Sequence, residues 1–270
     1  MEYLCQMAVL VVFAGGRSVR FGRDKCTHRV GGKRLIDYVI EAGLGVARRV
    51  VIAAGHNAAL YQGEEVLLDS QRFSGPLAAV DAAANSIDDV LLFAPCDAPY
   101  LKAMVFEALL DAEAPLAAWV FPNGRVESTI FKAQPAPARG ALDFLSRFRR
   151  GRVDDLFRIV PTAFLSMERR GVDPSWFINI NRPGDLERRF VEIRQRIFVE
   201  DYVLRWPQPP LVKWLEAGDV GALREEFLKY VEAGLLSMAA HVAKDLAATA
   251  RSYGVLAEAI YDAVDIDKAR

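Results

Sequence analysis

The sequence predicts an α/β protein with a mostly parallel open sheet flanked by helices, followed by an all-α C-terminal extension. Valine-rich runs such as Ala8–Phe13 and Arg49–Ala53 lack polar alternation, which is typical of strands buried on both faces of a sheet. Helical patterns separate these runs, and this order favours a parallel sheet with right-handed crossovers. After the proline-rich stretch Trp206–Pro210 every pattern is helical.

The first half of the chain is expected to alternate strands and helices. The expected strands are Ala8–Phe13, Arg49–Ala53, Glu65–Leu68, Asp89–Ala94 and Leu116–Phe121. The expected helices are Leu35–Leu44, Leu77–Ala84 and Leu101–Asp111. Pro76 follows Gly75 and suits the first turn of the second of these helices.

The second half is less regular up to the extension. We expect strands over Val126–Ala133 and Thr162–Met167, a helix over Ala138–Arg150, an extended segment Trp176–Ile180 and a helix from Pro183 to about Ile197. In the extension we expect helices near Leu211–Ala217, Val220–Glu232, Leu235–Arg251 and Val255–Val264, with stops at Gly218, Gly234 and Gly254. The predicted domains are therefore residues 1–200 and the extension 211–270.

Composition describes a globular protein without a general charge preference. The 270 residues are 52% hydrophobic and 26% charged, with a formal net charge of −1. This balance predicts no affinity for nucleic acid or for an anionic membrane, so an anion site must be a local arrangement. The widely spaced Cys5, Cys26 and Cys96 fit reduced thiols better than a disulfide framework, which predicts a cytoplasmic location.

The segment after the first strand predicts a phosphate-binding loop. Gly15 and Gly16 let the backbone turn sharply and bring bare N–H groups close to a ligand, while Arg20 and Lys25 supply positive charge. The glycine spacing differs from that of a P-loop and from that of a dinucleotide fingerprint. An ordinary glycine turn with solvated basic residues is the alternative.

Two aspartates follow other expected strands, at the edge where an open α/β sheet binds ligands. Asp97, between Pro95 and Pro99, suits a Mg²⁺ ligand that also touches phosphate oxygens. Alternatively, it caps the following helix near Tyr100. Asp69 suits a polar contact to a nucleotide or metal, or is simply a turn residue.

Two further groups of polar residues lie later in the chain. Asn179 and Asn181 flank Ile180, so an extended backbone points both amides to one side, towards a phosphate or a metal, unless they bond their own turn. A basic cluster follows the helix expected at Ala138–Arg150 and is read as a solvated helix end, with an anionic second substrate as the alternative. Its members are Arg147, Arg149, Arg150 and Arg152.

The polar motifs, in order, resemble those of the molybdenum cofactor guanylyltransferases, which are nucleotidyltransferases. The first motif is Phe13-Ala14-Gly15-Gly16 with Ser18, Arg20, Gly22 and Asp24-Lys25. The later motifs are Asp69 with Gly75-Pro76-Leu77, Pro95-Cys96-Asp97-Ala98-Pro99, and Phe177-Ile178-Asn179-Ile180-Asn181 with Pro183, Asp185 and Leu186. The resemblance covers Val9 to Glu187 and implies a Rossmann-like sheet.

The resemblance implies Mg²⁺-dependent transfer of GMP from GTP to the phosphate of molybdopterin, with release of pyrophosphate. It implies that Lys25, Arg20 and Asp97 carry the chemistry, with Asp97 as the Mg²⁺ ligand. The implied nucleotide-binding residues are Phe13, Ala14, Gly15, Gly16, Ser18, Lys25, Asp69, Gly75, Asn179 and Asn181.

The sequence also departs from the family pattern. An asparagine expected near the end of the second strand is Ala53 or Ala54, which leaves the base preference open. One alternative is a related transferase that uses another NTP or acceptor, of the cytidylyl or sugar-phosphate type. The other is a non-catalytic nucleotide-binding module. The extension after Pro210 lies outside the resemblance and is expected to dock a partner protein or to mediate self-association; the sequence leaves the oligomeric state open.

Overall fold

The computed structural model describes residues 8–16, 24–187, 190–197 and 199–265. Ser18, Arg20 and Gly22 of the predicted phosphate loop lie outside the described residues. The strands are β1 (Ala8–Phe13), β2 (Arg29–Val30), β3 (Lys33–Arg34), β4 (Arg49–Ala53), β5 (Val66–Leu67), β6 (Val90–Pro95), β7 (Leu116–Val120), β8 (Val126–Ala133), β9 (Thr162–Ser166) and β10 (Tyr202–Leu204).

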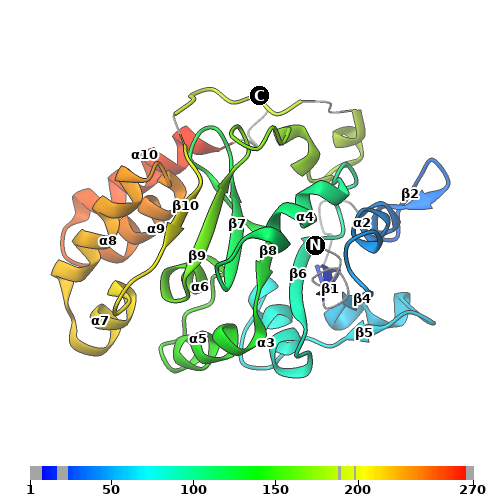
Figure 1. Cartoon of the computed structure of the whole chain (residues 1–270), viewed down its shortest axis with the longest axis horizontal. Coiled ribbons are helices and arrows are strands. Elements are labelled where there is room, and N and C mark those ends of the chain that lie inside the picture. Colours follow the sequence, from blue (N-terminus) through cyan, green and yellow to red (C-terminus); the bar gives the residue numbers. More distant parts are fainter. Residues whose placement is uncertain (1–7, 17–23, 188–189, 198, 266–270) are drawn as a thin grey trace.

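Helices alternate with these strands and then continue without them (Figure 1). The α-helices are α2 (Leu35–Leu44), α3 (Pro76–Ser86), α4 (Ala103–Asp111), α5 (Pro135–Arg147), α6 (Asp154–Ile159), α7 (Pro210–Ala217), α8 (Val220–Glu232), α9 (Leu236–Leu246) and α10 (Arg251–Val264). Short 3-10 segments are η2 (Gly55–Leu60), η3 (Pro174–Phe177) and η4 (Pro183–Glu187).

Within the described residues, eight strands form one sheet in the order β10-β9-β7-β8-β6-β1-β4-β5. β1 pairs in parallel with β4 on one side and with β6 on the other. Only β8 and β10 run antiparallel to their neighbours in this sheet as described. The sheet is therefore mostly parallel, which confirms the predicted fold class.

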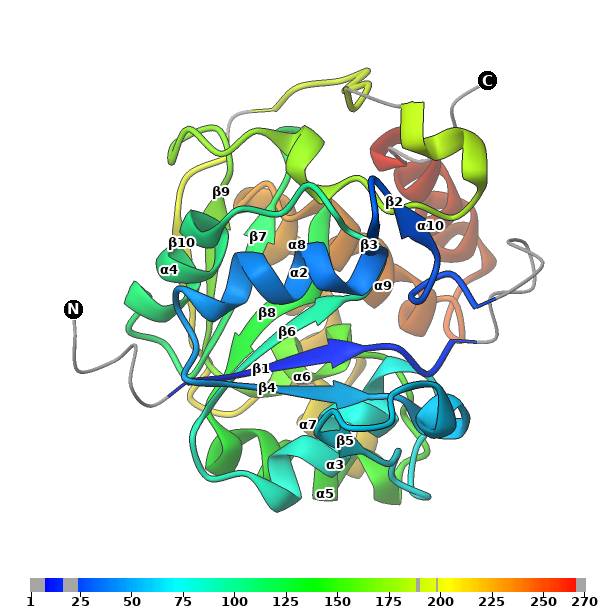
Figure 2. The ribbon, with the colours of Figure 1, turned by 90° about the vertical axis from the view of Figure 1, so that its right-hand side faces the viewer.

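Helices cover both faces of the sheet, with α2 on one side and α3 and α5 on the other (Figure 2). Alternate residues of β1 face opposite ways. Leu10 packs in one cluster with Ile36 of α2, whereas Val11 packs in a second cluster with Leu77 of α3. All of β1 except its last residue is fully buried, which explains why its sequence lacks polar alternation.

The C-terminal helices share the second of these clusters. Tyr230, Leu235 and Met238 are fully buried there together with Phe131 of β8 and Phe157 of α6. Figure 1 shows α8, α9 and α10 (orange to red) beside the β9–β10 edge of the sheet. The extension therefore packs on the sheet instead of standing apart from it. No described helix is both long and apolar enough to cross a bilayer.

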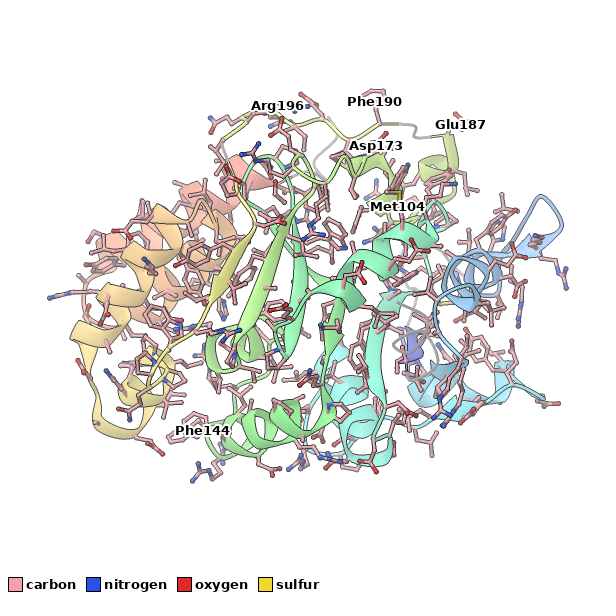
Figure 3. All side chains as sticks on the ribbon, in the orientation of Figure 1. Met104, Phe144, Asp173, Glu187, Phe190 and Arg196 are labelled. Atoms are coloured by element: carbon pink, nitrogen blue, oxygen red, sulfur yellow. A yellow bond between two sulfur atoms is a disulfide. The ribbon has the colours of Figure 1, made fainter. Side chains whose placement is uncertain are left out.

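Two local expectations about the segment after β9 are wrong. The helix expected from Pro183 to Ile197 is only the short segment η4, and residues 190–197 contain no helix. Phe190 is 72% exposed there, and Figure 3 shows Phe190 and Arg196 pointing outward along one rim. Val191, Ile193 and Ile197 pack against the core clusters, but their spacing does not place them on one face of a helix. Residues 174–177 form a 3-10 turn and not an extended segment.

Glycine ends two of the C-terminal helices but not the third. Gly218 ends α7 in the left-handed conformation, and Gly234 follows α8 with φ of 70°, as predicted. Gly254 instead lies inside α10. It is therefore not a stop, and a Cβ atom there would make an ordinary contact with Ala247 Cβ at 3.5 Å, at the end of α9.

Candidate active site

The turns after β1, β4 and β6 begin side by side at the carboxyl edge of the sheet. Ala14 N donates to the carbonyl oxygen of Ala53 at 2.8 Å, and Cys96 N donates to that of Phe13 at 3.1 Å. The ring of Phe13 stacks on Phe93 in the core at 5.5 Å between centroids, so Phe13 offers only its backbone to this edge. Figure 2 shows β1 and β4 pointing towards the same side of the molecule.

The carboxylate of Asp69 lies directly against the glycine turns. A Cβ atom at Gly15 would come within 3.2 Å of Asp69 Oδ2, and one at Gly55 within 2.5 Å. Gly55 also has φ of 51°, which an L-residue rarely adopts. Burial raises the pKa of Asp69, and the nearby His56 partly offsets this rise. The two glycines therefore let a partly buried acid reach the edge beside the loop.

Asn57 holds this turn in place, and the sequence reading missed it. Its side-chain amide Nδ2 lies 3.1 Å from the carbonyl oxygens of Ala14 and Gly16, and 3.2 Å from Asp24 Oδ2. It thus joins the two ends of the loop, before and after residues 17–23. An asparagine four residues after the end of β4 was a usable signal, but it stands three to four residues beyond the expected position at Ala53 or Ala54.

Lys25, Asp97 and Asn181 meet at one point although they are far apart in the sequence. Lys25 Nζ forms an ion pair with Asp97 Oδ2 and lies 3.3 Å from Asn181 Oδ1. Asp97 is only 4% exposed, and the side chain of Lys25 is 20% exposed. The carbonyl oxygen of Asp97 accepts from Ile180 N at 2.8 Å, which ties the asparagine segment to the end of β6.

The alternative role of Asp97 as a helix cap is wrong. Helix α4 begins at Ala103, and its N-cap residue is Lys102, with φ of −120°. Asp97 therefore lies a full turn before the helix, and its carboxylate contacts Lys25 instead of helix N–H groups. A buried carboxylate held by a lysine at the ligand-binding edge is typical of a functional site.

Cys26 and Cys96 form a disulfide with a Cα–Cα distance of 5.4 Å, so the expectation of free thiols at these two positions is wrong. Their separation of 70 residues gave no sign of the bond, because only the sheet brings the end of β6 next to the loop. The bond joins the residue after Lys25 to the residue before Asp97, so it holds this ion pair together. The cytoplasmic location stays a prediction.

Two other predicted residues lie away from this ion pair. Gly75 is the N-cap residue of α3, with φ of 64° and open space around it. Asn179 lines a separate cavity of about 310 Å³, where its Oδ1 is buried without a hydrogen-bond partner among the described residues. Of the two asparagines, Asn181 therefore contacts the ion pair and Asn179 lines this cavity.

The basic cluster after α5 is neither a uniformly solvated helix end nor a uniform anion site. Arg150 is mostly buried and forms ion pairs with Asp155 and Asp245. Arg147 lies over the ring of Phe144 at 5.1 Å, and Arg152 lines the cavity. Arg150 is buried because α9 packs beside it and provides Asp245. The local sequence around Arg150 does not show this contact.

A magnesium ion fits the ion-pair position by the chemistry of its donors. Among the described residues no three His, Cys, Asp or Glu side chains gather into a metal-binding group. Asp97 and Asn181 nevertheless direct two oxygens at one cationic centre, Lys25 Nζ. Mg²⁺ takes few protein carboxylates and completes its shell with water and phosphate oxygens, so one carboxylate suffices.

Comparisons with known proteins identify relatives of this chain. The family described as MobA-like NTP transferase domain matches residues 10–154. A probable molybdenum cofactor guanylyltransferase of Halalkalibacterium halodurans is 33% identical, over 65% of this chain and 94% of that protein. One of Pyrococcus furiosus is 32% identical, over 67% and 96%. Each of the two leaves about a third of this chain unmatched.

Among solved structures, the fold is similar to that of a molybdopterin-guanine dinucleotide biosynthesis protein A from Archaeoglobus fulgidus. The TM-score is 0.54 with 23% identity, over 67% of this chain and 95% of that chain. The family match covers more than half of the chain. The chain therefore belongs to the family of MobA-like NTP transferase domains and is a nucleotidyltransferase.

Proposed function

We propose that this nucleotidyltransferase transfers GMP from GTP to the phosphate of molybdopterin and releases pyrophosphate, with Mg²⁺ as the metal. The contact of Lys25 with both Asp97 and Asn181, beside the Gly15–Gly16 turn, is the observation that carries the proposal. The relatives are named molybdenum cofactor guanylyltransferases, which supports a guanylyl donor and the molybdenum cofactor as acceptor.

The chemistry is an in-line displacement at the α-phosphorus of GTP. An oxygen of the acceptor phosphate forms a new bond to that phosphorus, while the bond to the bridging oxygen breaks and its electron pair leaves with pyrophosphate. A phosphate monoester has a second pKa of about 6, so the acceptor is already an anion near neutral pH and needs no general base. The chain must mainly align the groups and neutralise their charge.

Each described residue has a defined task in this scheme. The backbone of the Gly15–Gly16 turn lies against the triphosphate, and Lys25 neutralises the leaving pyrophosphate. Mg²⁺, when bound at Asp97, would neutralise charge on the phosphate oxygens. Asp69 contacts the nucleotide next to the turn. Arg20 and Ser18 belong to the same proposal, although they lie outside the described residues.

A transferase with another base preference is a second candidate, because the base-reading asparagine expected near the end of the second strand is Ala53 or Ala54. Pyrophosphate release should therefore be measured with each of the four NTPs and Mg²⁺, with and without molybdopterin-containing extract. We expect acceptor-dependent release from GTP alone. Pyrophosphate release from CTP or UTP instead would identify that nucleotide as the donor. Binding of GTP without pyrophosphate release from any NTP would favour the non-catalytic binding module.

Lys25→Ala and Asp97→Ala should each lower kcat by about a hundredfold or more, because each removes a charge that contacts the reacting phosphates. Lys229→Ala and Asp88→Ala are the matched controls. Lys229 lies on α8 and Asp88 is 91% exposed. Controls and wild type should have the same rate. A near-native rate for either active-site variant would contradict the assigned role.

A further inference from the structure

We propose that the C-terminal helices complete the acceptor site, so that the ring system of the acceptor lies in the cavity between β8, the α5–α6 loop and helices α9 and α10. The proposal rests on the proposed function, which provides a phosphorylated heterocycle as acceptor. The cavity measures about 310 Å³, which is at the lower end of the size of small-molecule sites.

The cavity adjoins the ion pair through three consecutive residues. Asn179 lines the cavity, Ile180 N bonds to the carbonyl oxygen of Asp97, and Asn181 contacts Lys25. The first residues of β8, including Glu127, line it from the carboxyl edge of the sheet. An acceptor in the cavity thus has its phosphate within a short distance of the place where the α-phosphate of GTP is expected.

The extension provides one wall of this cavity. Ser237 of α9 and Tyr261 and Val264 of α10 line it, opposite residues of β8. Figure 1 shows α10 at the same end of the molecule as the turn between β7 and β8. A protein that ended after the matched two-thirds of the chain would lack this wall and leave the cavity open to water.

Two buried polar atoms in the wall lack partners, which points to a ligand. Asn179 Oδ1 and the hydroxyl of Tyr261 are both buried and make no hydrogen bond within the described part of the chain. A buried polar group without a hydrogen-bond partner is unfavourable. Burial raises the pKa of Tyr261 to about 12, so its hydroxyl remains a donor at neutral pH. A bound ligand that accepts from Tyr261 and donates to Asn179 satisfies both.

The charges around the cavity indicate which part of the acceptor it takes. Its charged lining consists of two arginines and three acids: Arg125, Arg152, Glu127, Asp154 and Asp265. Arg152 is already bonded to Asp154 at 2.8 Å. This balance disfavours a free phosphate and favours a heterocycle with ring N–H and amino donors, such as a pterin. The phosphate of the acceptor then points to the end of β6, beside Asp97.

The wall is held rigidly, which a specificity pocket requires. Asn123 Nδ2 donates to the carbonyl oxygen of Val264 at 3.0 Å, and Val126 N donates to Ser237 Oγ at 2.8 Å. Beneath them, Arg158 is fully buried and forms a bidentate pair with Glu226 at 2.7 Å. The helices therefore keep Tyr261 in place before any ligand binds.

The test is the binding of 6-hydroxymethylpterin, a fluorescent pterin, to the full-length protein and to Tyr261→Phe. We expect the variant to bind this probe about tenfold more weakly, because it loses one hydrogen bond to a buried group. Its affinity for GTP should not change. Tyr253→Phe is the control, because Tyr253 lies on the same helix but packs on Phe227. Thermal unfolding checks that both variants are folded.

The outcomes separate this inference from the proposed function. Equal probe binding by Tyr261→Phe and wild type would overturn the inference, as would no binding to wild type. An unchanged KM for the phosphorylated acceptor in Tyr261→Phe, with GMP transfer intact, would overturn it too but leave the function standing. Probe binding that depends on Tyr261, without pyrophosphate release from any NTP, would support the pocket and contradict the function.

Discussion

Asn57 holds together the two ends of the proposed phosphate loop. One amide group reaches the carbonyl oxygens of Ala14 and Gly16 and the carboxylate of Asp24. The first two precede residues 17–23 and the third follows them. In the proposed function, these contacts align the backbone of the Gly15–Gly16 turn before GTP binds.

Replacing Asn57 with alanine should therefore weaken GTP binding more than it slows the chemical step. We expect KM for GTP to rise about tenfold, as for the loss of about 1.4 kcal/mol of binding free energy. Steady-state kinetics with varied GTP measure this. Asn85→Ala is the control, because Asn85 donates to the carbonyl oxygen of Asp81 on α3 at 2.8 Å, away from the loop. Equal KM values in the two variants would contradict this role.

At the scale of elements, the disulfide joins the loop after β1 to the turn after β6. These elements already neighbour each other in the sheet, so the bond adds a constraint on the loop and not on the strands. In the unfolded chain it closes a loop of 70 residues. The chain-entropy treatment assigns about 4 kcal/mol of stabilisation to a loop of that order.

Reduction of the disulfide should lower the free energy of unfolding. The denatured protein should show one reactive thiol before reduction and three afterwards, since the chain has three cysteines. Urea unfolding should then show lower stability with reducing agent, by up to about 4 kcal/mol. Cys26→Ala should be insensitive to the agent. Three reactive thiols before reduction would show that the bond is absent in solution.

At the scale of the whole molecule, buried ion pairs join the C-terminal helices to the rest. Arg158 on α6 pairs with Glu226 on α8 and Asp245 on α9. Asp155 on α6 accepts from His241 of α9 at 2.9 Å and from Arg150. Such pairs add little net stability, but losing one partner leaves a buried charge and costs about 3–5 kcal/mol. The division of the chain at residues 200–211 stays a prediction, since these pairs and a shared apolar cluster cross it.

The same pairs predict how stability depends on pH. Burial alone raises the pKa of Asp155, but hydrogen bonds from His241 and Arg150 outweigh burial and hold its pKa well below the ordinary value. A depressed folded-state pKa contributes stability above the unfolded pKa of about 3.9, and this contribution is lost as the pH falls below it. The melting temperature should therefore drop between pH 5 and pH 3.

Asp155→Asn is the matched variant for this measurement. It should be less stable than wild type at pH 7, and its melting temperature should fall less between pH 5 and pH 3, because the titrating group is gone. Circular dichroism melts at pH 7, 5, 4 and 3 give both curves. Parallel curves for the two proteins across this range would show that Asp155 does not contribute to the acid sensitivity.

Local patterns in the sequence sufficed for much of the fold. The run Ala8–Phe13 and the segment Val126–Ala133 are strands with the predicted bounds, and Val220–Glu232 is a helix as predicted. Ala8–Phe13 is a continuous buried apolar run, and Val220–Glu232 has buried residues at helical spacing, so their secondary structure is encoded by neighbours in the chain. The helix expected over Pro183–Ile197 failed because Val191, Ile193 and Ile197 pack on the core from an irregular segment, and such packing is not a local property.

By itself the sequence determined the fold class, the family motifs and the position of Asp97 after the end of a strand. The tertiary structure alone decided three things: that Cys26 is bonded to Cys96, that Asn57 closes the loop, and that Tyr261 lines a cavity beside Asn179. Each depends on a contact between residues far apart in the chain. Such contacts cannot be deduced from spacing along the sequence alone, because the sheet order and the packing of the helices decide which distant segments touch.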